Sequence, residues 1–301
     1  MTNTKETPVR STSFSLASKV KDYFALIKFT LSFTVVFSCV ICYLLAPKVV
    51  AYDWTMIILL FIAGMLVTGS ANAINQAVEK DTDAMMKRTA KRPVASGAMS
   101  QSEALTFATI AGLGGVFMMW YFFNASSALL SAFSLILYAF IYTPLKKINS
   151  IAVLVGALPG ALPCLIGWVA GNDDFSAGGW VLFGMQFLWQ FPHFWAIAWV
   201  AHNDYTNAGF KLLPSKTGPT KFTAIQTVMY SVLMIPVGIL PYYFGLTGNF
   251  SLWIVMACNI AMVIQSMRLY MSMDVKAARR VMFSSYIYLP IVLLALLADK
   301  V

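Results

Sequence analysis

The chain has 301 residues, of which 59% are hydrophobic and only 11% are charged, and its mean hydropathy is +0.73. This composition excludes an ordinary water-soluble domain, because too few polar residues are present to cover its surface. The net charge of +9 requires no nucleic-acid partner, since membrane orientation explains where the basic residues gather. We therefore expect an all-α, polytopic membrane protein that contacts the lipid bilayer and no nucleic acid.

The predicted elements are membrane-spanning helices, since about 20 consecutive apolar residues suffice to cross the hydrocarbon core. Before them, residues 1–23 are polar and rich in Ser and Thr, and we expect a short, poorly ordered cytoplasmic tail. Residues 24–301 would form one domain of nine transmembrane helices. These lie near residues 24–46, 54–72, 104–123, 126–143, 151–170, 180–201, 223–244, 251–268 and 281–298.

The basic residues predict the direction in which these helices cross the membrane. With nine spans and a cytoplasmic N-terminus, the cytoplasmic segments are the tail and the loops after spans two, four, six and eight. All Lys and Arg residues fall in these segments or at their borders except Lys28, Lys48 and Lys300. Because basic flanks resist translocation, this bias supports both the number of spans and the orientation.

A cluster of polar side chains follows the second span. If this helix continues past residue 72, then Asn72, Asn75, Glu79 and Asp83 share one face, whereas Asp81 points away. Three oxygen-bearing side chains in a row suit Mg²⁺, which completes its shell with water and substrate phosphate oxygens. The alternative is that charges gather where a helix leaves the bilayer. That alternative leaves the two asparagines unexplained, because an unsatisfied amide at the membrane border is costly.

A second polar cluster, "WVAHNDYTNAGFKLLP", follows the sixth span on the same predicted side. Asp204 is the only acid of this loop, and His202 and Lys211 lie nearby in the sequence. Two loops with acids at one face of a bundle can enclose a diphosphate between bridging cations. Asp204 therefore joins Asn75, Glu79 and Asp83 as a candidate catalytic residue and metal ligand.

Several segments resemble one known family. The spacing of Asn75, Glu79 and Asp83, followed by "MMKRTAKRP", resembles the first aspartate-rich motif of the UbiA superfamily of intramembrane prenyltransferases. Five later segments resemble its haem-farnesylating branch: "YTPLKK" at 142–147, "GALPGALPCLIGW" at 156–168, "FLWQFPHFWAIAW" at 187–199, "DYTNAGFKLLP" at 204–214 and "ARRVMFSSYIYLP" at 278–290.

The resemblance implies a fold and a reaction. The fold would be a nine-helix bundle around a central cavity, open sideways to lipid and capped by the two polar loops on the cytoplasmic side. The reaction would join the farnesyl group of farnesyl diphosphate to a vinyl group of haem b, with Mg²⁺ as cofactor. The resemblance also implies a bacterial cytoplasmic membrane and, as a further partner, a downstream haem-modifying enzyme.

The sequence departs from the family pattern at two positions. Glu79 stands where Asp is usual, which lengthens the side chain by one methylene. Many superfamily relatives also carry a second Asp-x-x-x-Asp, whereas here Val200 stands four residues before Asp204. A single metal ion is therefore better supported than a pair.

Breaking an allylic diphosphate leaves negative charge on the leaving group, which cations and hydrogen-bond donors can neutralise. The candidate diphosphate-binding residues are Arg88, Arg92, Tyr142, Lys146, Lys28 and Lys91. For each basic residue, membrane orientation alone remains an alternative explanation, and it is the favoured one for Lys80 and Lys87.

The chain has only two histidines, His193 and His202. His193 lies within the sixth predicted span, and an intramembrane imidazole is a site hypothesis, with haem iron as an obvious partner. The alternative is a hydrogen bond to a neighbouring helix. His202 is open to either haem or diphosphate contact, and Trp195 is a candidate for haem contact, although aromatic residues in such helices more often serve packing.

Two other functions remain open at this stage. A prenyltransferase could act on another acceptor, such as a quinone precursor, but the "PHF" and "DYTNAG" segments argue against it. A membrane transporter would also have intramembrane polar groups and broken helices. Its polar groups should lie near the bilayer midplane, whereas the acids here lie at one predicted edge.

Overall fold

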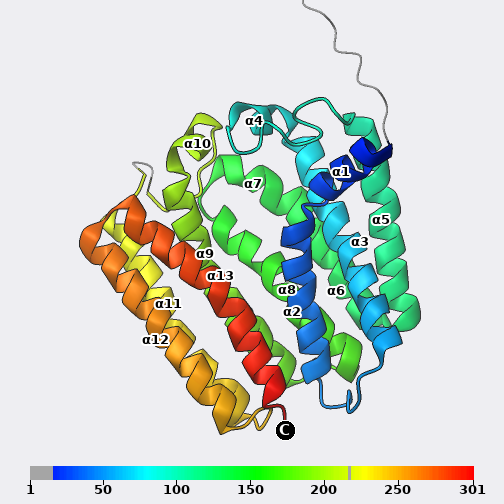
Figure 1. Ribbon diagram of the computed structural model, residues 1–301, viewed down its shortest axis with the longest axis vertical. Helices are drawn as coiled ribbons and strands as arrows, with labels where there is room; N and C mark the ends of the chain where they lie inside the picture. The colour runs from blue at the N-terminus through cyan, green and yellow to red at the C-terminus, as the bar shows by residue number, and fades with distance from the viewer. Residues whose placement is uncertain (1–15, 216–217) are drawn as a thin grey trace, which may run out of the picture.

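The computed structural model describes residues 16–215 and 218–301, and within these ranges the chain forms helices and no strand. The helices are α1 (Leu16–Leu26), α2 (Phe29–Leu45), α3 (Trp54–Val78), α4 (Lys80–Met85), α5 (Gln101–Phe122), α6 (Ala125–Ile136), the π-helix η1 (Leu137–Tyr142), α7 (Thr143–Ile148), α8 (Ala152–Asn172), α9 (Ala177–Val200), α10 (His202–Asn207), α11 (Lys221–Tyr243), α12 (Asn249–Ser272) and α13 (Val275–Ala298). The long helices run roughly side by side, and α1, α4, α7 and α10 gather at one end of the bundle (Figure 1).

In the described ranges, seven helices are long and apolar enough to cross a membrane, or eight if the bent pair α1 and α2 forms one span. Each of the nine predicted segments falls on one of these helices, on the bent pair or on α9. Helix α9 has 24 residues but is not among the candidate spans, because Gln186, Gln190 and His193 lower its hydropathy. The structure thus supports a multi-pass membrane protein, and the number nine stays a prediction.

Helix α9 lies at the centre of the packing, against α8, α11 and α13, while α3 packs along α5 and α2 along α8. The main core is made of buried apolar side chains from these helices. The α2–α8 contact is so close that a Cβ at Gly167 would lie 1.9 Å from the Cys39 carbonyl oxygen. Only glycine permits this approach, which agrees with the packing role expected of small residues in a membrane helix.

The first predicted span, 24–46, is wrong as a single helix, because the chain bends by 52° between α1 and α2. Lys28 lies at the bend with a left-handed backbone (φ 48°, ψ 58°). Helix α1 also begins at Leu16, inside the stretch expected to be a poorly ordered tail, so residues 16–23 are helical. The rest of that stretch, 1–15, lies outside the described residues.

Side chains from α3 donate hydrogen bonds to the carbonyl groups at this bend. Gln76 Nε2 donates to the carbonyls of Ala25 (3.0 Å) and Leu26 (2.8 Å), and Asn72 Nδ2 donates to that of Ile27 (3.2 Å). An unpaired buried carbonyl would cost free energy comparable to a lost hydrogen bond. Asn72 therefore stabilises the bend, which accounts for an amide at this membrane border.

The second break is milder, because α3 passes into α4 with only Glu79 between them. The turn still carries helical hydrogen bonds, from Glu79 N to Asn75 O (3.0 Å) and from Asp83 N to Glu79 O (2.7 Å). The predicted continuation of the second span past residue 72 is thus confirmed. The fourth predicted span also continues, through η1 into α7, as one candidate span from Ala125 to Ile148.

Candidate functional site

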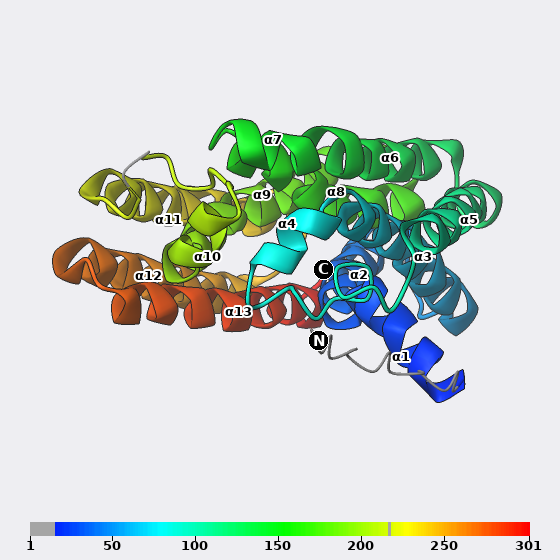
Figure 2. The ribbon, with the colours of Figure 1, turned by 90° about the horizontal axis from the view of Figure 1, so that it is seen from above.

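The two predicted polar loops meet at the end of the bundle where α4, α7 and α10 lie close together in both views (Figures 1 and 2). We call this region the polar end. Arg88 Nη2 donates to the Tyr205 hydroxyl (3.2 Å), and Lys211 N donates to the Lys146 carbonyl (2.8 Å). Met86, after α4, packs against Phe210, after α10.

The three oxygen-bearing side chains of the predicted metal site, which we call the strip, lie inside the polar end. Asn75, Glu79 and Asp83 are 1%, 4% and 0% exposed, whereas Asp81 is exposed. Their spacing of four residues places them on successive turns of one helix face. Sorting these acids by helix face thus predicted which of them are buried.

Each member of the strip is paired with a basic side chain from another segment. Lys28 Nζ donates to Asn75 Oδ1 (2.9 Å), and Lys146 Nζ lies 2.5 Å from Glu79 Oε1. Arg92 Nη1 donates to both oxygens of Asp83, at 2.8 and 2.7 Å. Three of the six predicted diphosphate-binding residues are therefore brought together on the predicted metal ligands.

The strip fits a hard divalent cation by the chemistry of its donors, an amide and two carboxylate oxygens. Glu79 Oε1 accepts no aligned hydrogen bond from any described residue. No group of three or more His, Cys, Asp and Glu side chains placed to hold a metal occurs in the described chain. Asp204 is half-buried on α10 and is not brought into such a group with Glu79 and Asp83.

An aromatic wall surrounds the Lys146 ammonium group. The Tyr142 ring lies 5.0 Å from Lys146 Nζ, and the Phe210 ring lies 5.3 Å from it, both as cation–π contacts. Tyr138 and Tyr142 lie on the π-helix η1, directly before Lys146 on α7, and π-helical turns often occur at functional sites. Thr143 also belongs to the site, because its Oγ1 accepts from Asn75 Nδ2 (3.3 Å). Sequence reasoning missed Thr143, since nothing in a lone threonine indicates this contact.

The other basic candidates lie further out. Arg88 is exposed but stacks its guanidinium 5.7 Å above the Tyr205 ring. Burial raises the pKa of the Tyr205 phenol, although Arg88 opposes the shift, so the hydroxyl keeps its proton at neutral pH and can donate it to a phosphate oxygen. Lys91, Lys80 and Lys87 are exposed, and the structure does not bring Lys91 to the strip.

His193 lies on α9 and is buried against α13. Its Nδ1 is 2.8 Å from Ser285 Oγ, and the Trp189 ring stacks on the imidazole at 4.7 Å. Trp195 is two residues further along α9 and therefore on the opposite side of the helix. It packs against Phe191 and Tyr230 in a cluster of buried apolar residues, so the structure does not bring it to His193.

His202 lies at the start of α10, apart from His193. Its Nδ1 contacts Thr206 Oγ1 at 3.4 Å, and a Cβ at Gly218 would lie 2.5 Å from its Nε2. Gly218 therefore covers the Nε2 side of the His202 ring, although the side chain is partly exposed.

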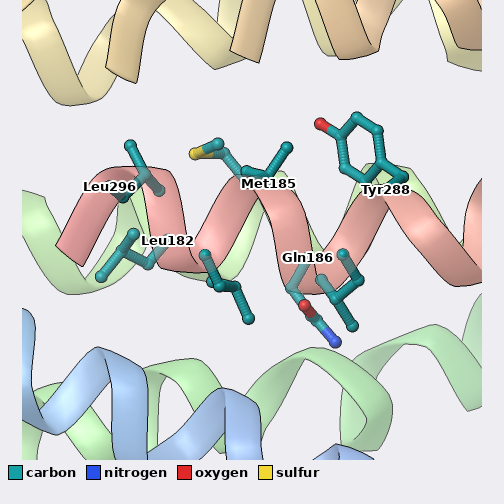
Figure 3. A pocket seen from close by; sticks show the side chains of 8 residues that line it. Leu182, Met185, Gln186, Tyr288 and Leu296 are labelled. Carbon is teal, nitrogen blue, oxygen red and sulfur yellow. The ribbon is translucent and has the colours of Figure 1, made fainter. Parts of the chain in front are cut away.

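A narrow pocket lies two turns below His193, between α9 and α13 (Figure 3). Gln186 and Tyr288 line one end of it, and Leu182 and Leu296 line the other. Its volume of about 10 Å³ suits a single water molecule and no prenyl chain.

Known proteins match this chain along most of its length. Residues 35–288 match the UbiA prenyltransferase family. A curated relative from Cytophaga hutchinsonii, named protoheme IX farnesyltransferase, is 44% identical over 286 residues, which cover 95% of this chain and 100% of the relative. A second with the same name, from Flavobacterium johnsoniae, is 38% identical and covers 96% of this chain and 97% of the relative.

Solved structures show the same fold at lower identity. A digeranylgeranylglyceryl phosphate synthase has a TM-score of 0.78 at 22% identity, covering 93% of this chain and 98% of that one. A UbiA homologue from Archaeoglobus fulgidus, bound to GPP and Mg²⁺, has a TM-score of 0.69 at 14% identity, covering 92% and 99%. With the family match and the full-length relatives, these findings show that the chain belongs to the UbiA prenyltransferase family.

Proposed function

We propose that this protein transfers the farnesyl group of farnesyl diphosphate to a vinyl group of haem b, forming haem O. The carbon–oxygen bond of the allylic diphosphate breaks, a carbon–carbon bond forms at the vinyl group, and water adds to the resulting cation with loss of a proton. Diphosphate is the second product. The name shared by the full-length relatives supports the substrates, and the polar end supports the ionisation step.

One observation carries this proposal: three oxygen donors on one helix face are paired with three cations from three other segments. Such a site holds the two kinds of group that Mg²⁺ and a diphosphate require. Asn75, Glu79 and Asp83 would hold the cation, with Asp204 as a further ligand. Mg²⁺ would withdraw charge from the leaving group.

The basic side chains would bind the diphosphate oxygens. Lys28, Lys146 and Arg92 already converge on the strip, and they would exchange its amide and carboxylate oxygens for phosphate oxygens when substrate enters. The remaining candidates would act around them: Arg88 and Tyr142 at the aromatic wall, and Lys91 after a movement of the segment after α4. Preorganised cations of this kind stabilise the transition state more than water does, because they need not reorient.

The haem would bind beside the polar end. There it would contact His193, whose ring lies 5.2 Å from that of Tyr286 on α13. His202 and Trp195 are the weaker candidates for haem contact, because one is covered and the other packs in the core.

The same proposal places the protein in a bacterial cytoplasmic membrane with nine spans and the polar end on the cytoplasmic side. The distribution of Lys and Arg supports this orientation. A haem-modifying enzyme that accepts haem O would be a partner, because the product is poorly soluble in water.

The test is to incubate the purified protein with haem b, farnesyl diphosphate and Mg²⁺ and to measure haem O by mass. Haem O should form in this mixture. Its formation should stop when EDTA removes Mg²⁺ and should resume when Mg²⁺ is restored. Absence of haem O under all three conditions would contradict the proposed function.

A further inference from the structure

Ser285 and His193 form a hydrogen bond that joins α13 to α9 within the apolar part of the bundle. The Ser285 hydroxyl also lies 2.6 Å from the Met282 carbonyl oxygen, one turn earlier in α13. Ser285 is 0% exposed and His193 is 9% exposed. Nothing in the diphosphate chemistry uses this pair.

The two contacts of Ser285 fix the direction of its bond to His193. A hydroxyl has one proton, and the Met282 carbonyl can only accept it. With the Ser285 proton donated to the Met282 carbonyl at 2.6 Å, the Ser285 oxygen accepts from His193, which places the imidazole proton on Nδ1. In the neutral ring, Nε2 then carries a lone pair and no proton.

The remaining neighbours hold the imidazole plane without occupying Nε2. Trp189 stacks on the ring with an interplanar angle of 21°, and its indole nitrogen donates to the Ser285 carbonyl (3.0 Å). Tyr286 and Phe194 contact the ring at 5.2 and 5.3 Å with T-shaped geometry. Within the described residues, Nε2 makes no hydrogen bond, and it is not one of the fully buried polar atoms that lack a partner.

From this geometry we infer that Ser285 is a positioning residue that holds His193 in its Nδ1–H form, so that Nε2 ligates the iron of haem b. A metal-binding histidine commonly donates its other N–H to a neighbouring oxygen, which fixes the ring and raises the basicity of the ligand. The inference rests on the proposed function for the identity of the metal-bearing substrate. It adds the ligating atom and the residue that orients it.

The first experiment needs no haem and therefore tests the positioning role alone. Only two histidines are present, so a His202→Gln background with ¹⁵N-labelled histidine leaves a single imidazole signal. Its one-bond and two-bond ¹H–¹⁵N couplings should show a proton on Nδ1. In Ser285→Ala, which lacks the acceptor, the Nε2–H form should appear. A wild-type imidazole protonated on Nε2 would overturn the inference.

The second experiment measures haem ligation without farnesyl diphosphate. Wild-type protein with ferrous haem b should show an iron–histidine stretching band in resonance Raman spectra, and His202→Gln should retain it. His193→Gln should lose the band. Ser285→Ala should keep the band at a lower frequency and bind haem about tenfold more weakly, as expected for loss of an outer partner. Retention of the band in His193→Gln would overturn the inference.

Two controls separate this result from misfolding and from failure of the proposed function. Ser266→Ala removes a buried hydroxyl on α12 whose one hydrogen bond within the described residues is to Ser231 (2.9 Å), so its band and haem affinity should match wild type. His193→Gly should regain an iron–imidazole stretching band with added imidazole, whereas His193→Gln at the same concentration should not. Haem O formation is measured separately, so an intact histidine band without product would contradict the reaction and leave the ligation standing.

Discussion

Glu79 occupies the single residue between α3 and α4, where the backbone leaves the regular helix (φ −94°, ψ 15°). Its carboxylate accepts from Asn75 Nδ2 (2.9 Å) and pairs with Lys146. The sequence marked this residue both as a candidate metal ligand and as a departure from the Asp of related motifs. The structure shows a use for the extra methylene, because the longer side chain reaches across to α7.

Lys146 and its neighbour Lys147 provide a matched comparison. Lys146 is 8% exposed and is paired with Glu79, whereas Lys147 is exposed. Lys146→Met should lower kcat/KM for farnesyl diphosphate by about 100-fold, as does loss of one group that stabilises a developing anion. Lys147→Met should leave it unchanged. Equal effects of the two variants would show that the lysines serve membrane orientation only.

Asp83 and Asp81 form a second matched pair on α4. Asp83 is buried against Arg92, and Asp81 is exposed. Asp83→Asn removes the charge but keeps the shape, so we expect the Mg²⁺ concentration for half-maximal activity to rise at least about tenfold. Asp81→Asn should show the wild-type Mg²⁺ dependence. An unchanged Mg²⁺ dependence in Asp83→Asn would remove this residue from the metal site.

At the scale of elements, apolar runs predicted where the long helices lie, but they did not predict the bend between α1 and α2. The stretch "ALIKFTL" contains no Gly or Pro to indicate a break. Its carbonyl groups accept hydrogen bonds from Asn72 and Gln76, about 45 to 51 residues later in the chain, which no local pattern reveals. The π-helix η1 was missed for the same reason, since its residues read as an ordinary apolar run.

The bend itself gives a prediction about α1 and α2. It places Lys28 against Asn75, so loosening it should weaken substrate binding without touching the diphosphate contacts directly. Asn72→Ala with Gln76→Ala removes hydrogen bonds of about 1 kcal/mol each. Hydrogen exchange should increase at residues 25–28, and KM for farnesyl diphosphate should rise.

Thr109→Val is the control for that pair, because in the described part of the chain the Thr109 hydroxyl bonds within its own helix, to the Leu105 carbonyl (2.9 Å). Its exchange pattern and KM should match wild type. Protection of residues 25–28 in the double variant equal to that in wild type would show that the bend does not depend on α3.

At the scale of the whole molecule, the polar end is electrostatically closed on itself, because each of the three side chains of the strip is paired with a cation. Burying such charges is tolerable only when they remain paired. Mg²⁺ alone must compete with Lys146 and Arg92 for the carboxylates, and diphosphate alone must compete with the carboxylates for the same cations. Their binding should therefore be coupled.

Calorimetry can measure this coupling. Mg²⁺ and a non-hydrolysable farnesyl diphosphate analogue should each bind weakly alone, and each should bind about 5- to 150-fold more tightly in the presence of the other. Lys146→Met should reduce the coupling, because Glu79 then has no cation to release. Independent binding of the two ligands would contradict an exchange of ion pairs.

Sequence reasoning reached most of the site because charge and helical spacing are local properties. It found the strip and the three cations that are paired with it, and it predicted that the two polar loops lie close together. It did not find Ser285, Thr143 or Trp189 as partners, since their roles depend on which helices pack together. Trp195 shows the converse, because an aromatic residue beside a histidine in sequence lies on the opposite side of α9.

The most direct test of the central claim is a competition between acceptors. Purified protein in lipid vesicles would receive Mg²⁺, farnesyl diphosphate and equal concentrations of haem b and a hydroxybenzoate quinone precursor, and both products would be measured by mass. We expect haem O with no prenylated benzoate, and loss of product in Asp83→Asn but not in Asp81→Asn. Prenylated benzoate without haem O would contradict the account.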